Sequence, residues 1–338
     1  MGRVFGNASR SGRCMIPNRK LGKSSLEISA LGLGCWQFSK GSGIVGKYWS
    51  ALDDQVITDI IRTSLEGGIN WFDTAEAYGK GESEKVLARV LNELDKEDEK
   101  ALVATKWWPL FRGATSITST IDQRLACLQN RTIHLYQIHQ PFSFSSISKQ
   151  MKAMAELVQQ GKVVTVGVSN FNAKQMREAH QVLAEYDIPL VSNQMKYSLL
   201  DRKIEQNGVM EAAKELGITI IAYSPLEQGL LTGKFHKNPE LLQASSRIRR
   251  LTNRKKLNNL SQTQPLIDTL EEIADQYQVS ASQVALNWLI TNHGDTVVAI
   301  PGATKVQHAK DNVGTLTFTL SEDERGQIDQ ASKQVLGI

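Results

Sequence analysis

The sequence lacks the features that mark several large classes of protein. No apolar run approaches the roughly 20 residues that span a bilayer as a helix. Only three cysteines are present, an odd number with no pair at metal-ligand or redox spacing: Cys14, Cys35 and Cys127. We therefore expect no membrane insertion, reduced thiols and a location in the cytoplasm.

Most of the chain carries almost no net charge. Residues 1–20 hold five basic side chains and no acidic one, so the net charge of +4 becomes −1 when those five are set aside. A nearly neutral remainder argues against a broad nucleic-acid-binding surface. We expect residues 1–15 to form a basic, disordered tail and residues 16–338 to form a single domain.

Short apolar runs alternate with helical patterns along the rest of the chain. Eight runs predict strands: 30–34, 69–73, 101–105, 134–139, 163–168, 190–194, 218–223 and 296–300. Between them, as in 54–66 and 147–158, apolar residues recur at the spacing of an amphipathic helix. Eight strand–helix units are typical of a (β/α)8 TIM barrel. A doubly wound sheet is the main rival, but residues 31–36 (LGLGCW) do not form its usual glycine-rich fingerprint.

Three segments are predicted as additions to the plain barrel. Residues 18–29 indicate an N-terminal β-hairpin that closes the bottom of the barrel, with turn chemistry at 22–25. Residues 229–262 form a long, poorly periodic connection after the seventh strand. Residues 280–292 predict an extra helix before the last strand, with Ser280 as its N-cap. The expected fold is therefore a TIM barrel with a hairpin and with extra helices and loops near the C-terminus.

Side chains able to do chemistry stand at the ends of successive predicted strands. Asp73, Lys106 and His139 each share a strand face with the residues two and four positions before them. Because the active site of a TIM barrel lies at the C-terminal ends of its strands, we expect these side chains to converge. Taken singly, each could have no catalytic role: Asp73 could cap a loop or helix, Lys106 could be a surface lysine and His139 a buried, hydrogen-bonded histidine. The loop residue Tyr78 could likewise serve only in packing. Together, the four residues indicate a catalytic site.

The four residue types fit proton transfer to a carbonyl oxygen. A free tyrosine has a pKa of about 10, which a nearby ammonium lowers. We expect Lys106 to lower the pKa of Tyr78, and Asp73 to hold Lys106 in place and charged. A neutral His139 would donate a hydrogen bond to the carbonyl or help to relay the proton. The sequence offers no convincing metal-ligand cluster, so the natural partner is an organic hydride donor.

Several short motifs fall in order at the predicted strand ends. They are 72–79 (FDTAEAYG), 137–139 (QIH), 167–171 (GVSNF), Gln194 with 197–198 (YS), 223–226 (YSPL), 229–234 (GLLTGK), 300–305 (IPGATK) and 311–312 (DN). In combination they resemble the aldo-keto reductase family over about residues 16–335. The resemblance implies a (β/α)8 barrel that binds NADPH without a Rossmann fold and transfers a hydride to an aldehyde or ketone.

The resemblance also implies a role for each matching residue. Asp73, Tyr78, Lys106 and His139 occupy the catalytic positions, with Tyr78 as proton donor. The implied cofactor-binding residues are Ser169, Asn170 and Gln194 for the carboxamide, Tyr223 for the nicotinamide ring, Ser224, Leu226, Gln228, Gly229, Leu231 and Lys234 for the pyrophosphate, and Gly302, Thr304, Lys305, His308 and Asn312 for the adenosine end. NADPH is the favoured cofactor because Lys305 can meet its 2′-phosphate. NADH is the alternative because many NADPH-preferring relatives have Arg or Gln where His308 stands. The implied substrate-pocket residues are Trp36, Trp49, Trp107 and Trp108, with core or rim packing as the alternative.

More than one function remains open at this point. A reductase of small-molecule aldehydes or ketones is the first, and the substrate itself is not written in the sequence. An NADPH-binding, redox-sensing regulatory subunit is the second, because channel-associated members of the family can keep the four catalytic residues. The basic segment 247–256 is interpreted as a solvated face, with cofactor-phosphate contact second and nucleic-acid binding a distant third. We expect no nucleic-acid partner and a monomer.

Overall fold

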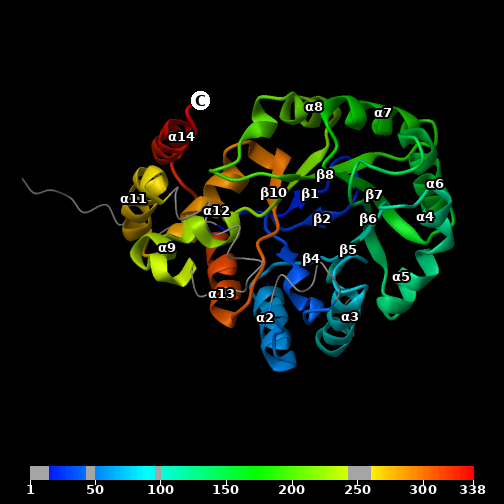
Figure 1. Ribbon diagram of the computed structural model, residues 1–338, viewed down its shortest axis with the longest axis horizontal. Helices are drawn as coiled ribbons and strands as arrows, with labels where there is room; N and C mark the ends of the chain where they lie inside the picture. The colour runs from blue at the N-terminus through cyan, green and yellow to red at the C-terminus, as the bar shows by residue number, and fades with distance from the viewer. Residues whose placement is uncertain (1–14, 43–49, 96–99, 243–259) are drawn as a thin grey trace, which may run out of the picture.

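Eight parallel strands form the centre of the molecule, with helices packed around them (Figure 1). The computed structural model describes residues 15–42, 50–95, 100–242 and 260–338. The strands are β3 (Leu33–Gly34), β4 (Trp71–Asp73), β5 (Leu102–Trp107), β6 (Ile133–Ile138), β7 (Val163–Ser169), β8 (Leu190–Lys196), β9 (Thr219–Tyr223) and β10 (Val297–Ala299). Each pairs with its neighbours in chain order, so all eight predicted strands are present.

The first and last strands of this sheet meet and close it into a barrel. Parallel bridges join Leu31 to Ala299 and Gly34 to Gly302. The Gly32 amide donates to the Ala299 carbonyl at 2.9 Å, and the Ala299 amide donates to the Ala30 carbonyl at 3.1 Å. The predicted (β/α)8 TIM barrel is therefore confirmed, and the C-terminal ends of its strands all face one side.

Several of the helices begin at a side chain that caps their first turn. The helices are α2 (Asp54–Glu66), α3 (Glu82–Leu94), α4 (Thr115–Ser119), α5 (Ile121–Cys127), α6 (Ile147–Gln159), α7 (Ala173–Ala184), α8 (Val209–Leu216), α9 (Lys234–Lys237), α11 (Leu260–Tyr277), α12 (Ala281–Thr291), α13 (Val306–Thr315) and α14 (Glu322–Leu336). Asp53 caps α2. Ser280 is the N-cap of the extra helix α12, as predicted, and forms a capping box with Gln283. Among the described residues, no helix combines the length and apolar character needed to cross a membrane.

Short helical turns occupy the segments between these elements. The 3-10 turns are η1 (Trp36–Ser39), η2 (Lys203–Glu205), η3 (Glu227–Thr232), η4 (Pro239–Leu242) and η5 (Gly294–Thr296). The long connection predicted at 229–262 contains the end of η3, all of α9 and η4, and the start of α11. The basic segment 247–256, Trp49 and most of the N-terminal tail lie outside the described residues.

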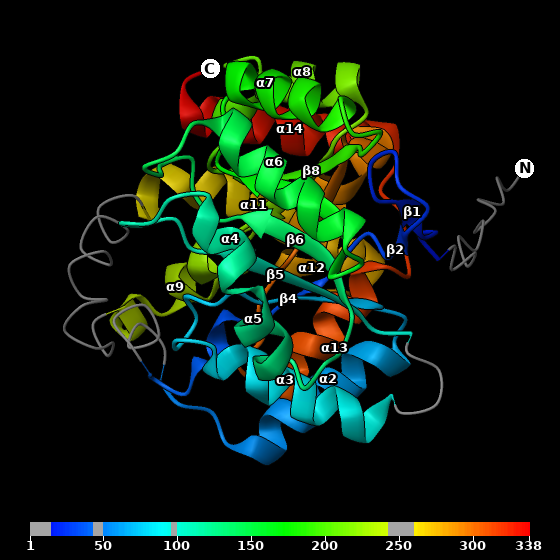
Figure 2. The ribbon, with the colours of Figure 1, turned by 90° about the vertical axis from the view of Figure 1, so that its right-hand side faces the viewer.

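The predicted hairpin covers the end of the barrel opposite to the strand termini that carry the predicted site (Figure 2). Its strands β1 (Arg19–Lys20) and β2 (Glu27–Ile28) are antiparallel. The buried side chains of Leu21 and Ile28 pack with Trp71 and Val191 from inside the barrel. The hairpin therefore closes the bottom of the barrel with apolar side chains, as the sequence indicates.

Close packing at Gly22 gives a prediction for stability. Gly22 has φ +54°, and a Cβ there would lie 2.4 Å from the Val191 carbonyl oxygen and 2.8 Å from its Cα. We expect Gly22→Ala to lower the free energy of unfolding by about 3 kcal/mol, through left-handed strain and overpacking together. Gly161 has φ +68°, and a Cβ there would meet no heavy atom within 4 Å, so Gly161→Ala should cost only about 1 kcal/mol. Equal costs in urea unfolding would show that the hairpin does not seat closely on the barrel.

Candidate active site

A buried ion pair lies at the C-terminal ends of β4 and β5. Lys106 Nζ donates to Asp73 Oδ1 and, at 2.8 Å, to the Thr74 carbonyl oxygen. The two charged side chains are 0% and 1% exposed. Asp73 Oδ2 accepts from Gln194 Nε2 at 2.9 Å and from Gln137 Nε2 at 3.3 Å. Because both carboxylate oxygens are engaged, the pair is held in one geometry.

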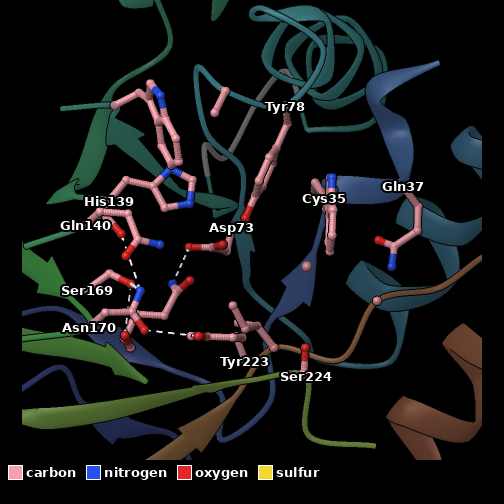
Figure 3. Close-up of a pocket in the computed structure, with 17 residues that line it drawn as sticks. Cys35, Gln37, Asp73, Tyr78, His139, Gln140, Ser169, Asn170, Tyr223 and Ser224 are labelled. Atoms are coloured by element: carbon pink, nitrogen blue, oxygen red, sulfur yellow. Dashed lines mark hydrogen bonds between the residues drawn. The ribbon is translucent and has the colours of Figure 1, made fainter. Parts of the chain in front are cut away.

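Tyr78 and His139 approach each other above this ion pair. Their ring centroids are 5.7 Å apart at an interplanar angle of 83°, and Lys106 Nζ lies 5.2 Å from the Tyr78 ring centroid. Figure 3 shows the Tyr78 hydroxyl pointing toward Asp73, with the His139 ring beside it. The structure therefore brings together the four residues that the sequence predicts as catalytic.

The environment changes the acidity of both aromatic groups. Burial lowers the pKa of His139 well below 6.5, and the Lys106 charge lowers it further, so this imidazole is neutral at neutral pH as expected. Burial also raises the pKa of Tyr78 well above 10.0, and the Asp73 carboxylate raises it further. The pKa of Tyr78 is thus raised and not lowered as the sequence predicts, because a buried phenolate would lose its hydration and would lie near the Asp73 carboxylate. Tyr78 therefore keeps its proton until a strong base forms beside it.

A cavity of about 270 Å³ opens above these groups. Its lining includes the predicted residues Asp73, Tyr78, His139, Trp36, Trp108, Ser169, Asn170, Gln194, Tyr223, Ser224 and Gly302. It also includes residues that the sequence did not single out, among them Cys35, Gln37, Ala77, Gln140 and Ile300. Lys106 does not line the cavity, but it pairs with Asp73 and lies near the ring of Tyr78, which both line it.

A larger cavity of about 580 Å³ continues from the first, sharing Trp36, Ser224 and Gly302 with it. Its lining includes the predicted residues Leu226, Gln228, Gly229, Lys234, Thr304, His308 and Asn312. It also includes Ser50, Leu52, Thr232, Ser280, Ser282 and Asp311, which the sequence analysis did not assign to a site. Together the two cavities form an elongated cleft that suits an extended ligand with one end beside Tyr78.

Hydrogen bonds fix the wall of the smaller cavity opposite Tyr78 (Figure 3). Ser169 Oγ donates to the Gln194 carbonyl oxygen at 2.9 Å, and Asn170 Nδ2 donates to Ser169 Oγ at 3.0 Å. The Tyr223 hydroxyl donates to Asn170 Oδ1 at 3.0 Å. Four residues that were predicted to contact a nicotinamide are thus linked into one preorganised surface.

Besides Lys106, three predicted residues in the described part of the chain line neither cavity. Trp107 is fully buried in the core, where its Nε1 donates to Ser116 Oγ at 3.0 Å. Core packing thus describes Trp107, because successive strand residues face opposite sides and its neighbour Lys106 faces the barrel interior. Leu231 is likewise fully buried in the core. Lys305 is exposed beside the larger cavity, immediately before α13.

Glu76 supports the cavity wall, although the sequence gave it no role. Its Oε1 accepts from the Trp108 backbone amide at 2.5 Å and from the Arg112 guanidinium. Trp108 in turn packs edge-on against His139, with ring centroids 4.9 Å apart. Arg112 lies 36 residues from Glu76 in the chain, so no local pattern could have predicted this pairing.

Comparison with known proteins agrees with this geometry. Residues 30–333 match the Aldo/keto reductase family, and the chain belongs to it. The chloroplastic pyridoxal reductase of Arabidopsis thaliana is 32% identical, with 94% of this chain and 87% of that protein covered. The L-glyceraldehyde 3-phosphate reductase of Escherichia coli (strain K12) is 30% identical, with 92% and 91% covered. The glycerol dehydrogenase structure from Gluconobacter oxydans superimposes with a TM-score of 0.76 at 26% identity, covering 95% and 96%. Membership supports an oxidoreductase that reduces carbonyl compounds.

Proposed function

We propose that this protein is an NADPH-dependent reductase of aldehydes or ketones in which Tyr78 is the proton donor. The observation that carries the proposal is the convergence of Tyr78 and His139 above the buried Asp73–Lys106 pair, at the floor of an open cavity. A substrate carbonyl in this cavity would accept hydrogen bonds from Tyr78 and from the neutral His139. Both donors are fixed before the reaction and point to where negative charge develops on the oxygen.

The side chains divide the proton chemistry between them. When bound, NADPH supplies the hydride. Tyr78 gives its proton to the developing alkoxide, a base strong enough to take it from a phenol of raised pKa. The Lys106 ammonium, 5.2 Å from the Tyr78 ring centroid, stabilises the phenolate that remains. Asp73 holds Lys106 in that position, and Trp36 and Trp108 exclude water from the reacting atoms.

The elongated cleft also has the polar groups that a dinucleotide needs. Asn312 Nδ2 lines the larger cavity and is buried, with no hydrogen-bond partner among the described residues. A buried donor without a partner is costly, and an aromatic ring nitrogen of adenine would satisfy it. Lys234 brings a cation to the same cavity, suited to phosphate. Tyr223 lines the smaller cavity and is followed in the chain by Ser224, which lines both.

A cofactor titration separates this assignment from a general charge effect. We expect Lys234→Met to weaken NADPH binding by about 10-fold or more, because one charge-assisted contact is lost. The matched control is Lys237→Met on the same helix, since Lys237 pairs with Glu271 at 3.0 Å and does not line the cavity. The measurement is quenching of tryptophan fluorescence by NADPH. Equal dissociation constants for the two variants would contradict the proposed phosphate contact.

The direct test of the proposed activity is NADPH oxidation, followed by absorbance, with a panel of small aldehydes that includes 4-nitrobenzaldehyde, methylglyoxal and pyridoxal. Turnover of at least one of them is expected. Tight NADPH binding without any turnover would contradict a general reductase and favour the redox-sensing regulatory subunit. Neither the reductase nor the regulatory-subunit proposal depends on the basic segment 247–256.

A further inference from the structure

Exposed apolar side chains gather on two loops beside the smaller cavity. Eight large hydrophobic residues are exposed in the part of the chain that the structure describes, and four of them lie on these loops. They are Leu110 (42% exposed), Phe111 (78%), Phe142 (45%) and Phe144 (77%). We call these four residues the aromatic rim. Apolar side chains that are exposed together in one place mark a binding surface, whereas single exposed ones need no explanation.

A continuous series of rings connects the rim to the proposed proton donor. The ring centroids of Tyr78 and His139 are 5.7 Å apart, and those of His139 and Trp108 are 4.9 Å apart. Trp108 then meets Phe142 at 6.0 Å, and each of these three contacts is edge-on. Phe142 therefore extends the aromatic wall of the cavity outward from the reacting centre.

Hydrogen bonds hold the two rim loops together. The Arg112 carbonyl oxygen accepts from the Phe144 amide at 3.1 Å and from Ser143 Oγ at 2.9 Å. The Ala114 amide donates to Ser145 Oγ at 2.9 Å. The Arg112 guanidinium is itself fixed by Glu76, the residue that also holds the Trp108 amide. The exposed rings are thus carried on an anchored support and not on a free loop.

The backbone of the rim is strained at Phe111, the most exposed of its four residues. Phe111 has φ +58°, in the left-handed region that bulky side chains rarely adopt. Such strain persists only where surrounding contacts impose it, and it gathers at sites that bind ligands. The Phe111 ring lies 6.4 Å from that of Phe144, so the two loops present a pair of neighbouring exposed rings.

We propose that the aromatic rim binds an apolar arm of the substrate, so that this protein favours carbonyl compounds with a long alkyl or extended aryl substituent. The inference rests on the proposed reductase activity and adds the substrate class to it. Its occupant is the arm of a bound substrate because the rim continues directly from the cavity that holds the carbonyl. Covering these rings removes apolar surface from water, which small or phosphorylated aldehydes would not do.

A pair of aldehydes that differ only in their arm tests the inference. Propanal and decanal are compared by kcat/KM in the wild type and in the Phe142→Ser/Phe144→Ser double variant. Both positions are exposed, so the fold should tolerate the change. We expect kcat/KM for decanal to fall at least about 10-fold while that for propanal stays within about twofold. The matched control is Val164→Ser, which also removes an exposed apolar side chain. Val164 lies at the N-terminal end of β7, whereas Ser169 at the C-terminal end lines the cavity, so neither kcat/KM value should change.

Each other outcome has a distinct meaning. An equal loss for both aldehydes, or no loss for either, would overturn the rim as a substrate site and leave the reductase intact. A wild-type dimer that the double variant dissociates, with unchanged preference between the aldehydes, would make the rim an interface between copies and would also overturn the inference. Failure of the wild type to reduce either aldehyde, although it binds NADPH, would overturn the proposed function and with it this extension.

Discussion

Replacing Tyr78 by phenylalanine is expected to lower kcat for aldehyde reduction by about 10²- to 10⁴-fold while NADPH affinity changes by less than about twofold. The substitution removes only the hydroxyl group that would protonate the alkoxide. The phenyl ring keeps its place beside Trp36 and His139, whose ring centroids lie 6.0 and 5.7 Å from that of Tyr78. The two quantities are measured by steady-state kinetics and by fluorescence titration.

A second tyrosine provides the control for this experiment. Tyr136 is fully buried, its hydroxyl has no hydrogen-bond partner in the described part of the chain, and it does not line the cavity. Tyr136→Phe should therefore leave kcat nearly unchanged. A Tyr78→Phe enzyme that turns over as fast as Tyr136→Phe would remove Tyr78 from the role of proton donor.

Breaking the buried ion pair from one side should cost both stability and activity. Lys106→Met leaves the Asp73 carboxylate, 1% exposed, without its counterion. Removing one partner of a buried pair typically costs 3–5 kcal/mol, and we expect about 4 kcal/mol here. Turnover should fall by at least about 10²-fold, because no ammonium remains to stabilise the Tyr78 phenolate.

The double variant Asp73→Asn/Lys106→Met separates the two effects. Asparagine removes the unpaired charge and keeps an oxygen that can accept from Gln194 and Gln137. Stability in urea unfolding should return to within about 2 kcal/mol of the wild type, while activity stays low. The single variants Asp73→Asn and Lys106→Met are measured beside it. If the loss of unfolding free energy in the double variant equals the sum of the two single losses, the two charges do not interact as the structure indicates.

Much of this site could be predicted because its positions follow from local rules. Asp73, Lys106 and His139 end neighbouring strands, and the two-residue alternation of a strand sets which way each side chain faces. The barrel then brings these ends to one side. The helices at 54–66 and 280–292 were predictable from local signals too, the first from the spacing of its apolar residues and the second with Ser280 as its N-cap.

What the sequence could not predict depends on contacts between distant segments. The same alternation that turns Lys106 inward turns Trp107 into the core, whereas the family resemblance implied a substrate-pocket role for Trp107, with packing as the alternative. The pKa of Tyr78 is raised mainly by its burial and further by the Asp73 carboxylate, and the burial of a loop tyrosine depends on the whole fold. The anchoring of the rim loops through Glu76 and Arg112 spans 36 residues and left no local signal.

The central claim is direct hydride transfer to a carbonyl carbon at the Tyr78 site, and isotope transfer tests it most directly. The wild type is incubated with 4-nitrobenzaldehyde and NADPH that carries deuterium at both positions of nicotinamide C4, and the product is analysed by mass spectrometry and NMR. The account predicts 4-nitrobenzyl alcohol with one deuterium on the carbinol carbon, and little alcohol from Tyr78→Phe. Alcohol without deuterium, or equal amounts of labelled alcohol from the variant, would contradict it.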